Sequence, residues 1–245
     1  MRVLIRSILD NYIPFIKKII PRKIISLLRP YLESMPMSPL GSRYHNNIAR
    51  DYELERATTK FWKKEQSVFK NEIVPFFKDQ NSVLDCPVGT GRFFREYSES
   101  NLYVVGVDLS SSMLALAEDQ SKNFSSDIDL YNCDASSVNK LNIQPDIIVS
   151  VRFLQNIVDI HSAKNIVSGF LSLNPNYLIL ELGYRHSGIF RWCYPSDKHC
   201  MRKLLYKDEL IHFLQNLGLS VVYESSPLQL DNIGVQKFFV CEPLN

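Results

Sequence analysis

Residues 83–93 read Val83-Leu84-Asp85-Cys86-Pro87-Val88-Gly89-Thr90-Gly91-Arg92-Phe93. A short apolar run leads into a turn that carries two glycines, and a helical pattern follows the turn. Glycine adopts backbone conformations that other residues avoid, and it lets the main chain come close to a ligand. The first N–H groups of the helix that follows are a further place where a ligand can bind. The stretch therefore predicts a strand, a ligand-binding turn and a helix in succession.

This turn differs from two common phosphate-binding motifs. The dinucleotide fingerprint GxGxxG is absent, and the GK[ST] of a P-loop does not follow the glycines. Two later apolar runs lead into acids, Asp108, which comes 23 residues after Asp85, and Asp134. A carboxylate at the C-terminal end of a strand can accept two hydrogen bonds from ribose hydroxyls. The spacing predicts a site for a nucleoside-containing cofactor.

Together these motifs resemble those of the class I S-adenosylmethionine-dependent methyltransferases. The pattern Asp85-x-Pro87-x-Gly89-x-Gly91 is similar to motif I of that family, DxGxGxG, with proline in place of the first glycine. The resemblance extends over residues 81–242 and implies S-adenosylmethionine as the cofactor. The cofactor-binding residues that it implies are Asp85, Pro87, Gly89, Gly91, Asp108, Leu109, Met113, Asp134 and Ala135.

The resemblance also gives several of these residues separate roles. It places Asp85 near the methionine part of the cofactor, Asp108 at the ribose, Met113 near the adenine, and Asp134 with the backbone of Ala135 at the exocyclic amine. A structural role is the alternative for three of them. Asp85 can bind loop amides, Met113 can be a core residue, and Asp134 can be an ordinary loop acid.

The order of apolar patterns predicts the fold class. Runs of strand length alternate with helical patterns from residue 82 to residue 217, which is typical of βαβ units on a parallel sheet. Two last runs, 220–224 and 235–241, suggest an antiparallel hairpin. We therefore expect an α/β protein with a Rossmann-like, seven-stranded, mostly parallel sheet, an antiparallel C-terminal hairpin and N-terminal helices. In the family that the chain resembles, the seventh strand lies antiparallel beside the fifth.

Charge and proline content divide the chain into three predicted parts. Residues 1–41 form a basic, amphipathic helical extension with a linker, 42–80 a helical lid, and 81–245 the cofactor-binding domain. The first 32 residues contain seven basic residues and one acid, a net charge of +6, while the rest carries −4, so the total of +2 conceals a division.

Three interpretations of the basic extension remain open. The first is a solvated appendage or dimer element. The second is a segment that lies on an anionic membrane, where each Lys or Arg adds roughly 1 kcal/mol to the binding free energy. RNA binding comes third because few aromatic residues interrupt the basic ones. The oligomeric state stays open.

Cysteine spacing and hydropathy exclude several classes. Five cysteines without a CxxC pair predict neither a disulfide framework nor a metal site, and they favour a reducing compartment. No apolar run is long enough for a transmembrane helix, and no secretory signal is evident. We expect a cytoplasmic protein, with peripheral membrane contact as the addition that the basic extension would make.

Acceptor-side residues are expected after the fourth and fifth strands, since ligands bind at the C-terminal edge of such sheets. Arg152 and Asn156 follow the fourth strand and either orient a substrate or pair locally. Tyr184 and His186 follow the fifth strand and are the candidates for a catalytic base, with a solvated loop as the alternative. The two remaining candidates, which either close over the cofactor or pack on the domain, are Tyr44 and Tyr52.

The acceptor itself is predicted only as a class. The chain lacks the [DN]PP[YFW] motif of DNA amino methyltransferases and the Pro-Cys nucleophile of cytosine C5 methylation. We expect methyl transfer from S-adenosylmethionine to a small molecule, such as a lipid or a quinone-like compound. The alternatives are an RNA or protein methyltransferase, and a catalytically silent methyltransferase-like domain that acts in binding or assembly.

Overall fold

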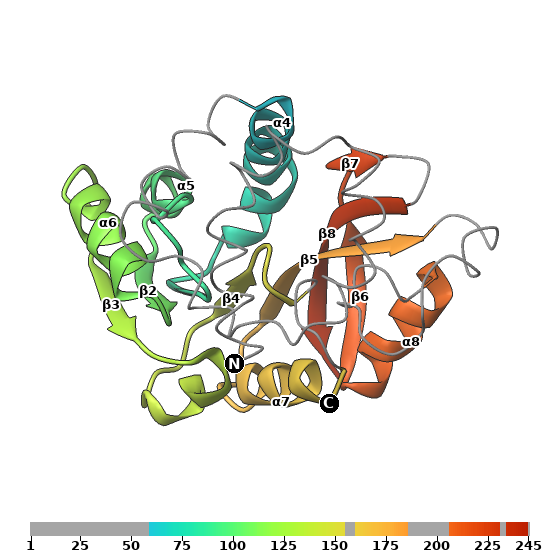
Figure 1. Cartoon of the computed structure of the whole chain (residues 1–245). Helices are drawn as coiled ribbons and strands as arrows, with labels where there is room; N and C mark the ends of the chain where they lie inside the picture. Colours follow the sequence, from blue (N-terminus) through green and yellow to red (C-terminus); the bar gives the residue numbers. More distant parts are fainter. Residues whose placement is uncertain (1–58, 155–159, 186–205, 231–233, 245) are drawn as a thin grey trace, which may run out of the picture. The chain divides into compact units, whose positions relative to one another are not determined.

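The computed structural model describes residues 59–154, 160–185, 206–230 and 234–244 (Figure 1). The predicted basic extension, residues 1–41, lies outside the described residues. So do four of the candidate site residues, Tyr44, Tyr52, Asn156 and His186.

The described strands form one twisted mixed sheet in the order β3-β2-β1-β4-β5-β8-β6, and β7 pairs with β8 off this path. Strands β3, β2, β1, β4 and β5 pair in parallel, whereas β8 is antiparallel to β5, β6 and β7. The strands are β1 Ser82–Asp85, β2 Tyr103–Asp108, β3 Ile128–Asn132, β4 Ile147–Ser150, β5 Tyr177–Arg185, β6 Leu219–Glu224, β7 Gln229–Leu230 and β8 Gly234–Pro243.

This topology confirms the predicted Rossmann-like sheet with antiparallel C-terminal strands. The last strand, β8, lies antiparallel between β5 and β6, as the family resemblance implied. Two details differ from the prediction. The two-residue strand β7 was not expected, and β5 continues to Arg185 because its pairing with β8 extends to Gly234. Apolar patterning missed both because neither segment is a long apolar run.

The described helices cover the sheet between the strands. The helix after β1 starts at Phe94, because residues 86–93 form turns, and the helix before β5 starts at Ile160. The helical elements are α4 Lys60–Val68, the π-helix η2 Phe69–Ile73, the 3₁₀ helix η3 Val74–Phe77, α5 Phe94–Glu99, α6 Ser111–Ser121, the 3₁₀ helix η4 Ala135–Lys140, α7 Ile160–Leu171 and α8 Lys207–Asn216.

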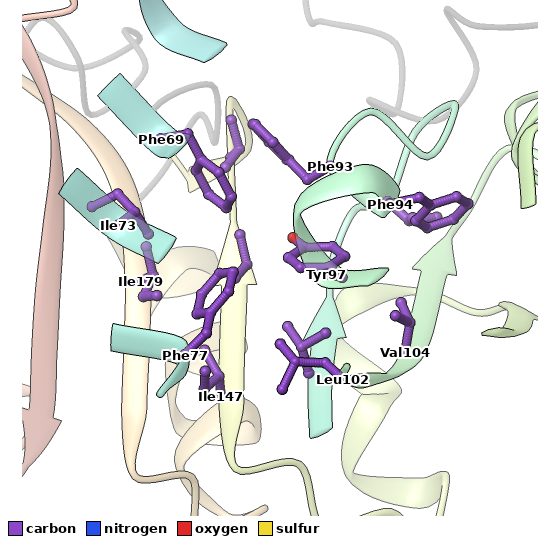
Figure 2. Packing of buried hydrophobic residues seen from close by; sticks show 14 of the residues in the cluster. Phe69, Ile73, Phe77, Phe93, Phe94, Tyr97, Leu102, Val104, Ile147 and Ile179 are labelled. Atoms are coloured by element: carbon purple, nitrogen blue, oxygen red, sulfur yellow. The ribbon is translucent and has the colours of Figure 1, made fainter. Parts of the chain in front are cut away.

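An aromatic cluster fixes the segment before β1 against the sheet. The side chains of η2, η3 and α5 meet here, as Figure 2 shows for Phe69, Phe77 and Tyr97. The ring of Phe69 stacks on that of Phe93 with centroids 3.9 Å apart and contacts Phe238 of β8 edge-on at 5.5 Å. Burial of large apolar side chains is the main stabilising term of such a core. Thus α4 and the turn after β1 are held in one packed unit.

The two faces of the sheet follow the alternation of strand residues. Val83, Ile147 and Ile179 face the aromatic cluster, while their sequence neighbours face the other way, as period-two strands require. In Figure 1 helix α7 runs along the side of the sheet away from α4. None of the helices within the described residues is long and apolar enough to cross a membrane.

Candidate active site

The glycine-bearing turn after β1 is hydrogen-bonded to both neighbouring strands, β4 and β2. The Cys86 N–H donates to the Val149 carbonyl of β4 at 2.9 Å, and the Val88 N–H donates to the Val107 carbonyl of β2 at 2.8 Å. The Cys86–Pro87 peptide bond is cis. These bonds place the turn at the C-terminal edge of the parallel strands, where ligands bind in open α/β sheets.

The two glycines of this turn both have positive φ angles but differ in their surroundings. Gly91 (φ +80°) lies against the first residue of α5, since a Cβ there would come within 2.2 Å of the Phe94 ring. Gly89 (φ +57°) borders open space, since a Cβ there would meet no atom within 4 Å. Its backbone therefore offers the close approach to a ligand that the sequence predicted.

Asp108 connects the end of β2 to that turn. One carboxylate oxygen accepts from the Gly89 N–H at 3.0 Å and the other from the Ser110 N–H at 2.8 Å. Burial raises the pKa of the Asp108 carboxyl, and these backbone hydrogen bonds partly oppose that rise. Each carboxylate oxygen has a second lone pair, so Asp108 can accept further hydrogen bonds, as a ribose-binding acid must.

Asn132 at the end of β3 completes the support of this edge, and the sequence analysis did not single it out. Its side-chain amide donates to the carbonyls of Asp108 and Leu109, both at 3.0 Å. The bonds hold the segment after β2 in place, where the Leu109 side chain is 46% exposed. An exposed apolar side chain beside a buried acid fits one side of an aromatic base. A polar residue in the last position of a strand is the signal that could have identified Asn132.

Asp85 lies below the turn and is almost completely buried. Its carboxylate accepts a hydrogen bond from the Tyr97 hydroxyl at 3.0 Å. Burial raises the pKa of Asp85 to about 8, while the Tyr97 hydrogen bond lowers it. The contact ties the turn to α5. It is a structural contact, but it is made to a hydroxyl and not to the loop amides named as the alternative above.

The remaining predicted cofactor residues lie around the same edge. Met113 in α6 is buried, and its N–H donates to the Ser110 hydroxyl that caps this helix. Asp134 is exposed and caps η4 by accepting from the N–H and hydroxyl of Ser136 at 2.8 and 2.6 Å. Ala135 follows it and is buried. The structure therefore brings all nine predicted cofactor residues to the ends of β1, β2 and β3.

Arg152, the described acceptor-side candidate after β4, is engaged inside the protein. Its guanidinium donates through Nε and Nη2 to the two carboxylate oxygens of Glu65 in α4, both at 3.0 Å. Its backbone N–H donates to the Glu181 carboxylate of β5 at 2.7 Å. Local pairing, the second interpretation given above, describes these contacts.

Tyr184, the described candidate for a base, lies within β5 because that strand is longer than predicted. Its side chain is buried, and its ring meets that of Phe239 edge-on at 6.4 Å. These contacts describe a core position on the sheet face that points away from Glu181.

Sequence reasoning missed the charged residues that contact Arg152 and the glycine-bearing turn. Glu65 and Glu181 are fully buried, and Arg92 in the turn contacts Glu65 and Gln66. No sequence signal separates Glu65 from the other acids of a polar helix, because its burial depends on strands far along the chain.

No metal-binding group occurs in the described part of the chain. There, no three His, Cys, Asp or Glu side chains lie close enough together to hold an ion. The described cysteines, Cys86, Cys133 and Cys241, are free thiols.

Comparison with known proteins gives the class. Residues 83–172 match the model of a family described as a methyltransferase domain. Among solved structures, the chain is similar to magnesium protoporphyrin IX methyltransferase from Synechocystis PCC 6803 with bound S-adenosylhomocysteine (14% identity, TM-score 0.58, covering 80% of this chain and 99% of that one). It is also similar to an S-adenosylmethionine-dependent methyltransferase from Clostridium acetobutylicum ATCC 824 (15% identity, TM-score 0.61, covering 82% and 99%). The curated protein sequences contain no significant match.

The fold, the glycine-bearing turn and the family match all point to the same class of protein. Residues 83–172 match a methyltransferase domain, and the sheet topology is that of the similar solved structures. Over residues 83–172 the chain is therefore similar to methyltransferase domains, and its fold is that of S-adenosylmethionine-dependent methyltransferases.

Proposed function

We propose that the chain transfers the methyl group of S-adenosylmethionine to a small-molecule acceptor. The observation that carries the proposal is the geometry at Gly89: its backbone borders open space, and its N–H is held by the buried Asp108. This combination gives a nucleoside a close backbone surface and a carboxylate for its ribose.

The cofactor residues follow from these positions. The ribose hydroxyls would donate to Asp108, which also binds the N–H groups of Gly89 and Ser110. The exposed side chain of Leu109 and the buried Met113 would flank the adenine, and the segment Asp134–Ala135 would meet its amino edge. S-adenosylmethionine supplies an electrophilic methyl group on a sulfonium. The chain's own part is to hold the donor and acceptor in line, since alignment alone accelerates such a displacement.

Two points favour a small acceptor over a macromolecule. The chain has no [DN]PP[YFW] motif after β4, where enzymes acting on DNA amino groups carry it. One similar solved structure is a magnesium protoporphyrin IX methyltransferase, which its name places among enzymes of small molecules. A lipid or quinone-like acceptor is the finer part of the proposal.

Transfer of a radiolabelled methyl group tests the proposal. Full-length protein and its Asp108→Ala variant are incubated with labelled S-adenosylmethionine and a cell extract, and the extract is then separated into small molecules, lipids, RNA and protein. The proposal expects label in the small-molecule or lipid fraction with the wild type only. Label in RNA or protein would replace the acceptor assignment. Binding of the cofactor without transfer into any fraction would favour a silent binding domain.

A further inference from the structure

Four charged side chains meet between α4 and the C-terminal edge of the sheet. They are Glu65 of α4, Arg92 of the turn after β1, Arg152 after β4 and Glu181 of β5, and we call them the charged cluster. Glu65 and Glu181 are 0% exposed, and the side chains of Arg92 and Arg152 are 10% and 17% exposed. Charged side chains are rarely buried to this extent unless they are paired.

Glu65 joins two arginines that come from opposite sides of the site. Arg152 donates to it through two nitrogens in a fork-like geometry, which fixes orientation as well as charge. The Arg92 guanidinium contacts the same carboxylate through Nη1. Arg92 follows Gly91 in the donor-side turn, whereas Arg152 follows the strand at which the acceptor is expected. One carboxylate on α4 therefore connects both sides.

Arg92 has further contacts that fix α4 to the donor-side turn. Its guanidinium lies over the Trp62 ring at 3.7 Å from the ring centre, and its Nε donates to the Gln66 amide oxygen at 3.0 Å. Its Nη2 donates to the Trp62 carbonyl at 3.3 Å. Cation–π contacts of a partly buried guanidinium add to its charge pairing. Movement of α4 would thus move Arg92 and, with it, the end of the glycine-bearing turn.

Arg152 is held in a backbone conformation that L-residues seldom adopt. Its φ angle is +56°, and its N–H is bound by Glu181. Glu181 is fixed in turn by a contact with the Gln236 side-chain amide of β8. Left-handed conformations of residues other than glycine persist when the surroundings determine them, and they concentrate at functional sites. The charged cluster provides those surroundings: Glu181 holds the backbone and Glu65 the side chain.

The carboxyl group of Glu65 lies beside that of Glu181 inside the cluster. Burial and the neighbouring Glu181 raise the pKa of Glu65 to about 9, against the lowering effect of Arg92. The charged groups that face Glu65 are Arg92, Arg152 and Glu181; Glu96 of α5 follows one step away, through Gln66.

We propose that Glu65 is a positioning residue of the methyltransferase site, which couples the donor-side turn to the residue after β4 through Arg92 and Arg152. The inference rests on the proposed function, because it assumes that the turn binds the donor. Buried ion pairs add little net stability compared with apolar packing. Positioning gives such a cluster a role that stability alone does not.

Calorimetry with S-adenosylhomocysteine tests the coupling. We compare the wild type with Glu65→Gln and with a matched control, Glu72→Gln, which removes a carboxylate of the same pre-strand segment that binds Tyr223 and Ser226 instead. The proposal expects affinity to fall about tenfold or more in Glu65→Gln and less than twofold in the control. Equal affinity in the wild type and Glu65→Gln would overturn it. A wild type that does not bind at all would instead contradict the proposed function.

A pH series separates positioning from a general loss of structure. Deprotonation of Glu65 adds a second negative charge beside Glu181, and the repulsion between the two carboxylates should loosen α4. Wild-type affinity should therefore fall between pH 8 and pH 10 more steeply than that of Glu65→Gln. The amino group of the ligand also titrates in this range, but it does so with both proteins and cancels in the comparison. Parallel curves would contradict the proposal.

A tryptophan signal tests the coupling without altering Glu65, in case Glu65→Gln does not fold. The chain has two tryptophans, Trp62 and Trp192, so Trp192→Phe leaves only Trp62, which lies against Arg92. Saturating S-adenosylhomocysteine should change the Trp62 emission, and adding Arg92→Lys should reduce that change by at least half. Emission that does not respond to the ligand, or that responds equally with and without the Arg92→Lys substitution, would overturn the proposal.

Discussion

The Asp108 carboxylate at the end of β2 accepts the backbone N–H of Gly89 at 3.0 Å. The acid and the glycine belong to adjacent strand-to-helix turns, and Asp108 also binds the N–H of Ser110. One carboxylate therefore fixes both turns that border the proposed donor site. Its position explains how an acid at the end of this strand orders both turns.

Replacement of Asp108 by alanine should abolish most donor binding. Hydrogen bonds to a charged group contribute about 1.5–3 kcal/mol each, so loss of two ribose contacts predicts a decrease in affinity of about a hundredfold or more. Calorimetry with S-adenosylhomocysteine measures this change. Asp119→Ala is the control, because Asp119 lies on α6 with an exposed side chain that pairs only with Lys122 among the contacts described. Unchanged affinity in Asp108→Ala would contradict the cofactor site.

The two glycines of the turn should respond differently to alanine. A Cβ at Gly91 collides with the Phe94 ring, whereas one at Gly89 enters open space. Gly91→Ala should therefore lower the melting temperature markedly. Gly89→Ala should lower the free energy of unfolding by only about 1–2 kcal/mol, the cost of an alanine in a left-handed conformation. Gly89→Ala should instead weaken ligand binding at least tenfold. Thermal melts and calorimetry on both variants separate the effects, and a reversed pattern would show that the ligand does not approach Gly89.

Asp85 should make the protein less stable as the pH rises from about 4 to about 8. Its pKa is raised in the folded state to about 8, so between these values the folded state binds more protons than the unfolded state, and the free energy of unfolding falls. The slope for one such group is at most about 1.4 kcal/mol per pH unit. Denaturant unfolding across this range measures it.

Asp85→Asn should make that pH dependence less steep while keeping an acceptor for the Tyr97 hydroxyl. Part of the slope should remain, because Glu65 has a pKa of about 9 and acts with the same sign. Asp119→Asn, a change at an exposed acid, should leave the slope as in the wild type. If Asp85→Asn has the wild-type slope, Asp85 is not the group that titrates.

Membrane contact, the second interpretation of the basic N-terminal segment, makes a prediction for the full-length chain. Replacing Lys17, Lys18, Arg22 and Lys23 by glutamine removes four of its seven basic residues. With roughly 1 kcal/mol per basic residue near an anionic surface, co-sedimentation with phosphatidylserine vesicles should fall by more than tenfold. Neutral phosphatidylcholine vesicles are the control. Equal sedimentation of both proteins with anionic vesicles would leave the solvated appendage as the interpretation.

Much of the cofactor side was predictable because it depends on local pattern. The apolar runs before Asp85 and Asp108, and the glycines between them, each act within a few residues of the chain, so strand, turn and helix followed from the sequence. Boundaries were less certain. β5 continues to Arg185 because β8 pairs with it, and Tyr184 consequently lies inside the sheet. Pairing partners far along the chain are not visible in local periodicity.

Local sequence pattern sufficed for the class of fold, the glycine-bearing turn and the acids at the strand ends. Which charged residues meet depends on the folded arrangement of the chain. Glu65, Arg92, Arg152 and Glu181 come from four separate elements, and each looks like an ordinary polar residue in its own segment. Their burial and their mutual contacts arise when α4 packs across the ends of β1, β4 and β5. The division has a physical reason: periodicity encodes local geometry, whereas charge pairing depends on contacts made after the chain has folded.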